Sequence, residues 1–263
     1  MTYLKLLESL ELLVPKIATE ILPTFFKGTT AEQKSDGSIV TAADFAMQDA
    51  LSIALNNLAP HIAMLSEEMS DQQQLKVIQS GQPYWCLDPV DGTNNFHHGV
   101  PLYAVSLALI EQGGIRLGVI YDPDRKELFS ACQQSGLRIN GVLYNKPTQP
   151  EILKKCLASV DFKRLENPLK KRLMEVMPFK SQRNIGTCAL EWAWLAAGRT
   201  QLLLHGGEKF WDYAAGTLIL KEAGGISCTD SGDSIFNNSL QNRSVVAASH
   251  QKLHEQWMAY LTA

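Results

Sequence analysis

Apolar residues recur at helical spacing near the start of the chain. Between Met1 and Phe26 they fall on one face of a helix, and charged residues interrupt them on the other face. The apolar positions are Leu7, Leu10, Val14, Ile17 and Ile21. This spacing predicts an amphipathic helix that faces a core. A second helix is predicted from Asp44 to Pro60, after a polar connection at residues 28–36.

From Tyr84 to about Asn145 the pattern changes to short apolar runs separated by turn residues such as Gly113-Gly114. After the run that begins at Tyr84, the predicted strands are Ala104–Ile110, Ile115–Tyr121, Glu127–Ala131 and Leu137–Leu143. A shorter apolar run, Ile62–Ser66, precedes them. Strands that follow two helices predict an α+β arrangement with helices packed on a sheet.

The segment Lys146–Pro150 is the predicted boundary between two parts, because its two prolines cannot continue a regular element. Beyond it, strands and helices alternate. The predicted strands are Leu157–Phe162, Gln201–His205, Ile226–Thr229 and Val245–Ala248, and the predicted helices are Pro168–Met177, Cys188–Ala197, Asp212–Ala223 and Leu253–Leu261. This alternation predicts an α/β part with a sheet covered by helices. We therefore expect two parts, residues 1–147 and 148–263.

The composition narrows the class of protein. The chain has 263 residues, 45% of them hydrophobic, and a formal net charge of −3, which gives no indication of a nucleic-acid or anionic-membrane partner. Its five cysteines are scattered without a C-x-x-C pair, which argues against a disulfide framework. The first segment lacks the basic start and unbroken apolar stretch of a signal peptide. We expect a cytoplasmic protein with no membrane or nucleic-acid partner.

The segment Trp85–Phe96 carries the most informative chemistry. An apolar run leads to two carboxylates, Asp88 and Asp91, with the backbone carbonyl of Val90 between them. A glycine and a threonine follow, at a predicted helix start. Mg²⁺ prefers oxygen ligands and is often shared with substrate phosphates, and phosphate binds free N–H groups at a helix N-terminus. The segment therefore predicts metal-assisted phosphoryl chemistry.

Each acidic residue also has a purely structural interpretation. Asp91 could cap the helix that follows it, and Asp212 is a natural N-cap for the helix predicted to begin there. Glu67 could be solvated charge at a strand end. Asp44 has two interpretations that do not exclude each other: it could be the N-cap of the second helix, or it could accept a proton passed through Thr93.

The combination favours a metal site. Asp88 and Asp91 crowd like charges directly after an apolar strand, and close carboxylates raise one another's pKa unless a cation compensates. If Glu67 and Asp212 converge on the same point, the site has four carboxylates and a carbonyl. That set could hold two or three magnesium ions, and paired metal ions clamp the attacking and leaving oxygens of an in-line displacement.

These motifs resemble those of the inositol monophosphatase family. The matching segments are Asp88-Pro89-Val90-Asp91-Gly92-Thr93-Asn94-Asn95-Phe96, Trp211-Asp212-Tyr213-Ala214-Ala215-Gly216, Glu222–Gly225, Lys34, Asp36–Thr41 with Asp44, Ser66-Glu67-Glu68 and Gly186-Thr187. Their order and spacing fit over nearly the whole chain. The resemblance implies a layered α-β-α-β-α sandwich and a magnesium-dependent, lithium-sensitive phosphomonoesterase that is often a dimer, so we expect a homodimer.

The resemblance also implies roles for individual residues. Glu67, Asp88 and the Val90 carbonyl would hold the first magnesium ion. Asp88, Asp91 and Asp212 would hold the second, and Glu67 would help to hold a weaker third.

Around these ions, Glu67 and Thr93, with Thr93 paired to Asp44, would position the attacking water. The amides of Gly92 and Thr93, next to Asp91, would face the phosphate.

The sequence departs from the family where the substrate is chosen. Seven residues before Asp212, inositol-selective members usually carry a glutamate, and this chain carries His205. Glu208 is nearby but out of register. Gly186 and Thr187 keep the small residues expected beside a sugar or polyol. We expect substrate contacts from these two residues, His205 and Asp212.

The expected reaction is hydrolysis of a small phosphate monoester, inositol 1-phosphate or a related polyol or sugar phosphate, by magnesium-activated water. Alternatives within the same superfamily are fructose-1,6-bisphosphatase, histidinol-phosphatase and 3′(2′),5′-bisphosphate nucleotidase. An alternative of another class is a non-catalytic regulatory or scaffold member, since some proteins of this family bind transcription machinery.

Overall fold

The computed structural model describes residues 2–26, 31–33 and 39–263. The predicted motif residues Lys34 and Asp36–Ser38 lie outside the described residues. Within the predicted polar connection, the described residues form β1 (Ala31–Gln33), which pairs antiparallel with β2 (Ile39–Thr41). No helix among the described residues is long and apolar enough to cross a membrane.

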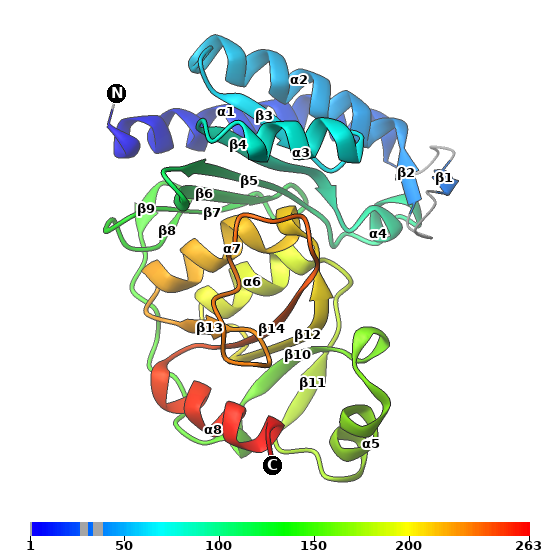
Figure 1. Cartoon of the computed structure of the whole chain (residues 1–263), viewed down its shortest axis with the longest axis vertical. Helices are drawn as coiled ribbons and strands as arrows, with labels where there is room; N and C mark the ends of the chain where they lie inside the picture. The colour runs from blue at the N-terminus through cyan, green and yellow to red at the C-terminus, as the bar shows by residue number, and fades with distance from the viewer. Residues whose placement is uncertain (1, 27–30, 34–38) are drawn as a thin grey trace.

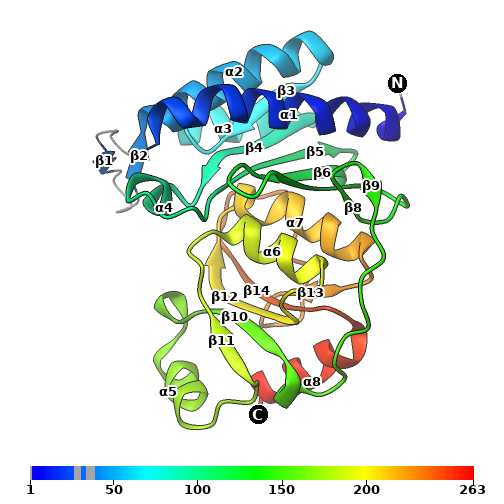
Figure 2. The same cartoon turned by 180° about the vertical axis from the view of Figure 1, so that it is seen from behind.

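Five layers of helices and sheets alternate through the molecule (Figures 1 and 2). Helices α1 (Tyr3–Phe25) and α2 (Ala42–Leu58) cover the outer face of a large sheet. Helices α6 (Cys188–Ala196) and α7 (Phe210–Glu222) lie between this sheet and a second one. The second sheet is covered on its far side by α5 (Asn167–Glu175) and α8 (Gln251–Leu261). The predicted α-β-α-β-α sandwich is confirmed.

The large sheet has seven strands in the order β3-β4-β5-β6-β7-β8-β9. Their bounds are β3 (Ala63–Ser66), β4 (Tyr84–Asp91), β5 (Ala104–Glu111), β6 (Gly114–Asp122), β7 (Glu127–Cys132), β8 (Arg138–Ile139) and β9 (Val142–Leu143). Only β3 and β4 pair parallel among these seven; the remaining pairs are antiparallel. The parallel pair requires a crossover connection, which α3 (Asp71–Gln79) supplies.

One sequence prediction in this region is wrong, and one helix was missed. The single strand predicted at Leu137–Leu143 is a hairpin, because Asn140 and Gly141 adopt φ angles of 51° and 75° and turn the chain between β8 and β9. Helix α3 was not predicted, although its start carries a capping box: Ser70 and Gln73 each accept a hydrogen bond from the other's backbone N–H.

The second sheet has five strands in the order β11-β10-β12-β14-β13. Their bounds are β10 (Leu157–Asp161), β11 (Ser181–Arg183), β12 (Leu202–Glu208), β13 (Ile226–Cys228) and β14 (Arg243–Ala248). Strand β10 pairs parallel with β11 and β12, whereas β14 pairs antiparallel with β12 and β13. Strand β11 was not predicted because its three residues, Ser-Gln-Arg, carry no apolar signal. Three short helical turns complete the described elements: α4 (Thr93–His97), Leu153–Lys155 and Phe162–Arg164.

Strand β4 is buried on both faces, which explains its continuous apolar run. Trp85 and Leu87 pack into the outer core beneath α1 and α2. Cys86 points the other way, into the inner core around α6 and α7. This alternation places the next even position, Asp88, on the inner face as well. The inner core takes residues from both predicted parts of the chain, and the division at residues 147 and 148 stays a prediction.

The close approach of α6 and α7 depends on Gly216, because a Cβ built there would lie 2.4 Å from Cβ of Trp192. We expect Gly216→Ala to destabilise the protein by about 1–3 kcal/mol through overpacking, which outweighs alanine's higher helix propensity. Urea unfolding measures the change. Gly114→Ala is the control, because the nearest atom to its added Cβ is 3.9 Å away. Equal stability of Gly216→Ala and wild type would contradict the packing argument.

Candidate metal centre

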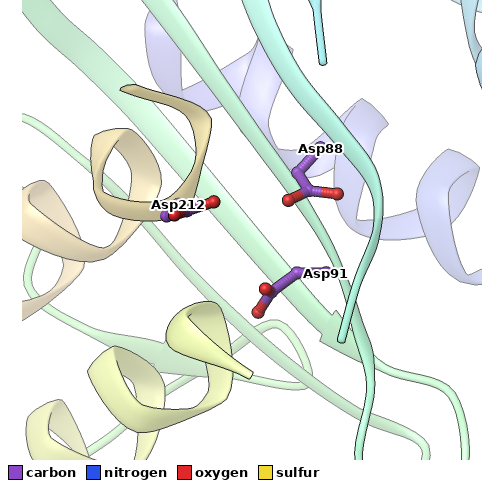
Figure 3. A group of neighbouring side chains, drawn as sticks. All are labelled: Asp88, Asp91 and Asp212. Atoms are coloured by element: carbon purple, nitrogen blue, oxygen red, sulfur yellow. The ribbon is translucent and has the colours of Figure 1, made fainter. Parts of the chain in front are cut away.

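Three aspartates meet where β4 passes the start of α7. Asp88, Asp91 and Asp212 each offer a carboxylate oxygen, and these oxygens all lie within 4.8 Å of one another. Figure 3 shows the three carboxylates pointing into one space, two from the strand and one from the helix. The predicted convergence of these three residues therefore exists in the structure.

A bulge in β4 brings Asp88 and Asp91 to the same side. Residues three apart on a regular strand point to opposite faces. Here Asp88 pairs with Ser106 of β5 and Asp91 pairs with Ala104, so β4 contains one extra residue between the two pairs. The extra residue shifts the alternation, and both carboxylates face α7. The backbone of Val90, inside the bulge, donates to Asp88 Oδ1 over 3.1 Å.

Asp91 is held by the N-terminus of α6. Its Oδ2 accepts hydrogen bonds from the Thr187 hydroxyl and from the Ala189 backbone N–H, the latter over 2.7 Å. The interpretation of Asp91 as a cap of the next helix is wrong, because Gly92 occupies the N-cap position of α4. Asp91 instead caps a helix almost a hundred residues further along the chain.

The predicted substrate residues Gly186 and Thr187 lie in this packed region. Thr187 is buried, and its hydroxyl is engaged with Asp91. A Cβ at Gly92 would lie 3.1 Å from Cβ of Thr187 and 3.0 Å from the Leu102 carbonyl oxygen. Gly92 has a φ of 90° as well, so only glycine fits at this position without strain.

Asp212 is the third residue of α7, not its N-cap. Its Oδ2 accepts from the backbone N–H of Lys209, which occupies the N-cap position, over 2.9 Å. A carboxylate at this position satisfies a free N–H of the helix start and lies at the positive end of the helix dipole. The helix begins at Phe210, two residues before the predicted start, and therefore carries Asp212 on its first turn.

Glu67 lies at the edge of this cluster. It follows directly after β3, and its backbone N–H donates to the Leu87 carbonyl oxygen over 3.2 Å. Its carboxylate contributes to the raised pKa values of Asp88, Asp91 and Asp212, so it lies close enough to repel their charges. It does not belong to the described group whose oxygens lie within 4.8 Å of one another.

Asp44 and Thr93 form the predicted pair. The Thr93 hydroxyl lies 3.2 Å from Asp44 Oδ1 and 3.0 Å from the Val90 carbonyl oxygen. The prediction of Asp44 as N-cap is wrong by three residues, because Thr41 is the N-cap of α2. Asp44 Oδ2 accepts from the Thr41 backbone N–H at 2.8 Å and from its hydroxyl at 2.7 Å.

His205 has partners that sequence reasoning did not find. It is 4% exposed, and its Nε2 lies 3.1 Å from Oδ2 of Asp161, which ends β10. Its Nδ1 accepts from the Gly207 backbone N–H over 3.1 Å, so in the neutral ring the proton is on Nε2 and points at Asp161. This hydrogen bond lowers the pKa of Asp161. Cys188 Sγ lies 4.0 Å from Nε2.

The metal-free cluster strongly disfavours full ionisation. Burial raises the pKa of Asp88 and Asp212 well above the usual range, and repulsion between the neighbouring carboxylates raises both further. Burial also raises the pKa of Asp91 to about 6, although its hydrogen bonds from α6 act in the opposite direction. Buried carboxylates that all face one point fit a hard divalent cation, because it supplies the missing positive charge through oxygen ligands alone.

Comparison with known proteins identifies the family. The model of the inositol monophosphatase family matches residues 5–263. "Inositol monophosphatase 1" from Solanum lycopersicum is 33% identical over 255 residues, covering 94% of this chain and 91% of the relative. "Nus factor SuhB" from Pasteurella multocida is 32% identical over 203 residues, covering 76% of this chain and 74% of the relative.

Solved structures agree with this result. A Thermotoga maritima IMPase superposes with a TM-score of 0.84 at 26% identity, covering 98% of this chain and 97% of that one. A staphylococcal inositol monophosphatase-1 has a TM-score of 0.87 at 23% identity, covering 100% of this chain and 97% of that one, which shows the shared fold. With the family model matching almost every residue, this chain belongs to the inositol monophosphatase family.

Proposed function

We propose that this protein hydrolyses a small phosphate monoester, inositol 1-phosphate or a related polyol or sugar phosphate, with the help of magnesium. The observation that carries the proposal is the meeting of Asp88, Asp91 and Asp212 oxygens within 4.8 Å, although Asp212 is far from the other two in sequence. Membership of a family of phosphatases, and relatives named inositol monophosphatase, support it. The cytoplasmic location and the homodimer remain predictions.

The donor set is suited to magnesium. Asp88, Asp91, Asp212 and the Val90 carbonyl would hold two ions, and Glu67 would add a ligand at the edge of the cluster. When bound, magnesium activates water and offsets the negative charge of the phosphate and the leaving alcohol. All these ligands are oxygens, and no cysteine is needed, as expected for a hard cation.

Thr93 and Asp44 would position the attacking water. When the Thr93 hydroxyl donates to Asp44 Oδ1, its lone pairs are free to accept a hydrogen bond from water. Asp44 is held by Thr41 on its other oxygen, so its orientation does not depend on substrate. Gly92 and Thr93 would present their backbone amides to the phosphate, beside Asp91.

His205 would contribute to the choice of alcohol. His205 Nε2 faces Asp161, so the predicted inositol-selecting position has no free carboxylate acceptor of its own. The ester panel therefore includes fructose-1,6-bisphosphate, histidinol phosphate and 3′-phosphoadenosine 5′-phosphate as alternatives to inositol 1-phosphate.

A regulatory role is the second candidate. The specific observation in its favour is the relative named "Nus factor SuhB", which is 32% identical. Absence of phosphatase activity on every ester tested, together with reproducible capture of a defined partner, would favour this role over catalysis.

The proposal is tested with a panel of phosphate monoesters assayed with and without Mg²⁺. We expect magnesium-dependent phosphate release that millimolar lithium inhibits. Asp91→Asn should lower kcat by a factor of at least about 10³, because it removes a ligand charge from the metal centre. Asp124→Asn, at an exposed turn position, is the matched control and should retain the wild-type rate. An active Asp91→Asn enzyme would refute the metal assignment.

Replacing His205 tests the selectivity position. A glutamate at position 205 would lie beside Asp161, so the replacement is made as the double variant His205→Glu with Asp161→Asn. We expect kcat/KM for inositol 1-phosphate, relative to the other esters, to rise by about tenfold, since a charged acceptor for a ring hydroxyl is gained. Asp161→Asn alone is the control. An unchanged ratio would remove position 205 from substrate selection.

The raised pKa values predict how stability depends on pH. The folded, metal-free protein binds more protons than the unfolded chain between about pH 4 and at least the Asp91 pKa of about 6. Its stability should therefore fall as pH rises through this window, by on the order of 1–3 kcal/mol for Asp91. Magnesium should restore stability at pH 7.5, because it binds the ionised carboxylates.

Urea unfolding at pH 5 and pH 7.5, with chelator or with Mg²⁺, measures this effect. His254 has the opposite effect on the pH dependence of stability, because burial lowers its pKa. Asp91→Asn isolates the contribution of Asp91, since His254 is present in both proteins. The variant should show a weaker pH dependence and less stabilisation by magnesium. Identical profiles for variant and wild type would contradict the account.

A further inference from the structure

A cysteine, a histidine and a methionine meet on the far side of the second sheet. Cys228 is the last residue of β13, which is an edge strand of that sheet. His254 and Met258 belong to α8, the helix that covers this side of the sheet (Figure 1). Because these two residues are four positions apart, their side chains lie on the same face of the helix. The sheet separates this Cys–His–Met cluster from the inner core around α6 and α7.

The other two donor atoms both lie close to the sulfur of Cys228. Its Sγ is 3.2 Å from His254 Nε2 and 3.6 Å from Met258 Sδ. A thiol has one proton to donate, so it can serve only one acceptor at a time. A soft cation in place of that proton would bond to the thiolate, the imidazole nitrogen and the thioether together.

The Cys–His–Met cluster is shielded from water but can be reached. Cys228 and His254 are each 8% exposed, whereas Met258 is half-buried. Burial lowers the pKa of His254, so its ring is neutral at pH 7 and keeps the lone pair that a metal ion needs. Bonds of about 2.0–2.3 Å, the lengths that imidazole and thiolate make to zinc, require the donors to separate slightly. The unbranched, flexible Met258 can move to admit the ion.

The donor set favours a soft cation over zinc. Among the described residues, the three aspartates of the candidate metal centre are the only group of three or more His, Cys, Asp or Glu side chains whose ligand atoms lie within 4.8 Å of one another. No third side chain of these types therefore joins Cys228 and His254, and structural zinc sites take four such ligands. The third donor here is a thioether, which together with a thiolate suits Cu(I).

We propose that Cys228, His254 and Met258 bind one Cu(I) ion in a three-coordinate site. On binding, the Cys228 thiol releases its proton to water and forms the copper–sulfur bond, while His254 Nε2 and Met258 Sδ each donate a lone pair. Copper stays Cu(I), so the step needs no oxidant or reductant. The ion joins the edge strand β13 to the C-terminal helix α8. This site is independent of the proposed phosphatase activity.

Competition for Cu(I) tests the site. The full-length, chelator-treated protein is titrated without oxygen against the coloured complex of Cu(I) with bicinchoninate. We expect wild type to take one Cu(I) per chain and Cys228→Ser to take none. His254→Gln and Met258→Leu should bind at least about tenfold more weakly, since even the outer-shell partners of a metal site change its affinity by about 10–100-fold.

Two control variants accompany these proteins. Met174→Leu makes the same substitution at a methionine of α5 that is 74% exposed. Cys188→Ser removes another cysteine that lies near a histidine, since its Sγ is 4.0 Å from His205 Nε2. Both should take up Cu(I) as wild type does.

Two further measurements report on geometry. X-ray absorption at the copper edge should show two sulfur neighbours and one nitrogen neighbour in wild type, and one sulfur neighbour in Met258→Leu. Cu(I) should also slow hydrogen exchange of the α8 amides in wild type and leave it unchanged in Cys228→Ser, because the ion ties the helix to β13.

The outcomes are distinct. No transfer of Cu(I) to wild type, or equal uptake by Cys228→Ser, would overturn the site. Unchanged affinity in Met258→Leu, or a single sulfur neighbour in wild type, would overturn the assignment of three donors. If Cys228→Ser fails to fold, His254→Gln and Met258→Leu decide the question, and wild-type affinity in both would contradict the inference.

Discussion

Crowded negative charge is the constraint around which this protein is organised. Asp88 and Asp91 are buried and Asp212 is half-buried, and the three carboxylates face one another where water screens their repulsion poorly. The protein reduces this repulsion with local donors. Two donors from the start of α6 hold Asp91, and a backbone N–H at the start of α7 holds Asp212. The remaining negative charge would be offset by cations, which is why we propose a metal centre here.

The layered fold holds these hydrogen-bond donors at fixed positions relative to β4. Helix α6 carries the donors for Asp91, and helix α7 carries Asp212 itself. The two helices approach closely at Gly216 and Trp192, where a single added carbon would clash. Because both helices also pack on the inner face of the large sheet, the bulged end of β4 meets them at a fixed position. A change in the α6–α7 packing would therefore move one carboxylate relative to another.

The sequence predicts the ligands better than it predicts their geometry. The acidic motifs taken together identify the three aspartates that converge, although each aspartate alone has a structural interpretation. The bulge that brings Asp88 and Asp91 to one side was not predicted, although Pro89 inside a central strand is a local signal for a bulge. The helix caps were misplaced because residue type alone does not fix the cap position. Asp44 and Asp212 are typical N-cap residues by type, but each occupies the third helical position and accepts from the true cap.

Contacts between distant segments were also beyond sequence reasoning. Asp161 and Cys188 lie next to His205 only because β10, α6 and β12 are neighbours in the second part of the fold. No motif marks Asp161, which simply ends its strand. Helix α3 is different: its Ser70 and Gln73 capping box was present in the sequence, but the polar composition of residues 71–79 concealed the helix. Local signals of this kind could have been found, whereas tertiary pairs could not.

The same electrostatics bears on whether the protein is a catalyst or a scaffold. Crowding three carboxylates whose pKa values are raised lowers the stability of the metal-free fold at neutral pH. A protein that acts only through its outer surface gains nothing from this cluster, and neutral residues there would make it more stable. The cost of the cluster is offset if cations occupy it, as we propose. A scaffold role would therefore be compatible with the proposed metal centre and would not replace it.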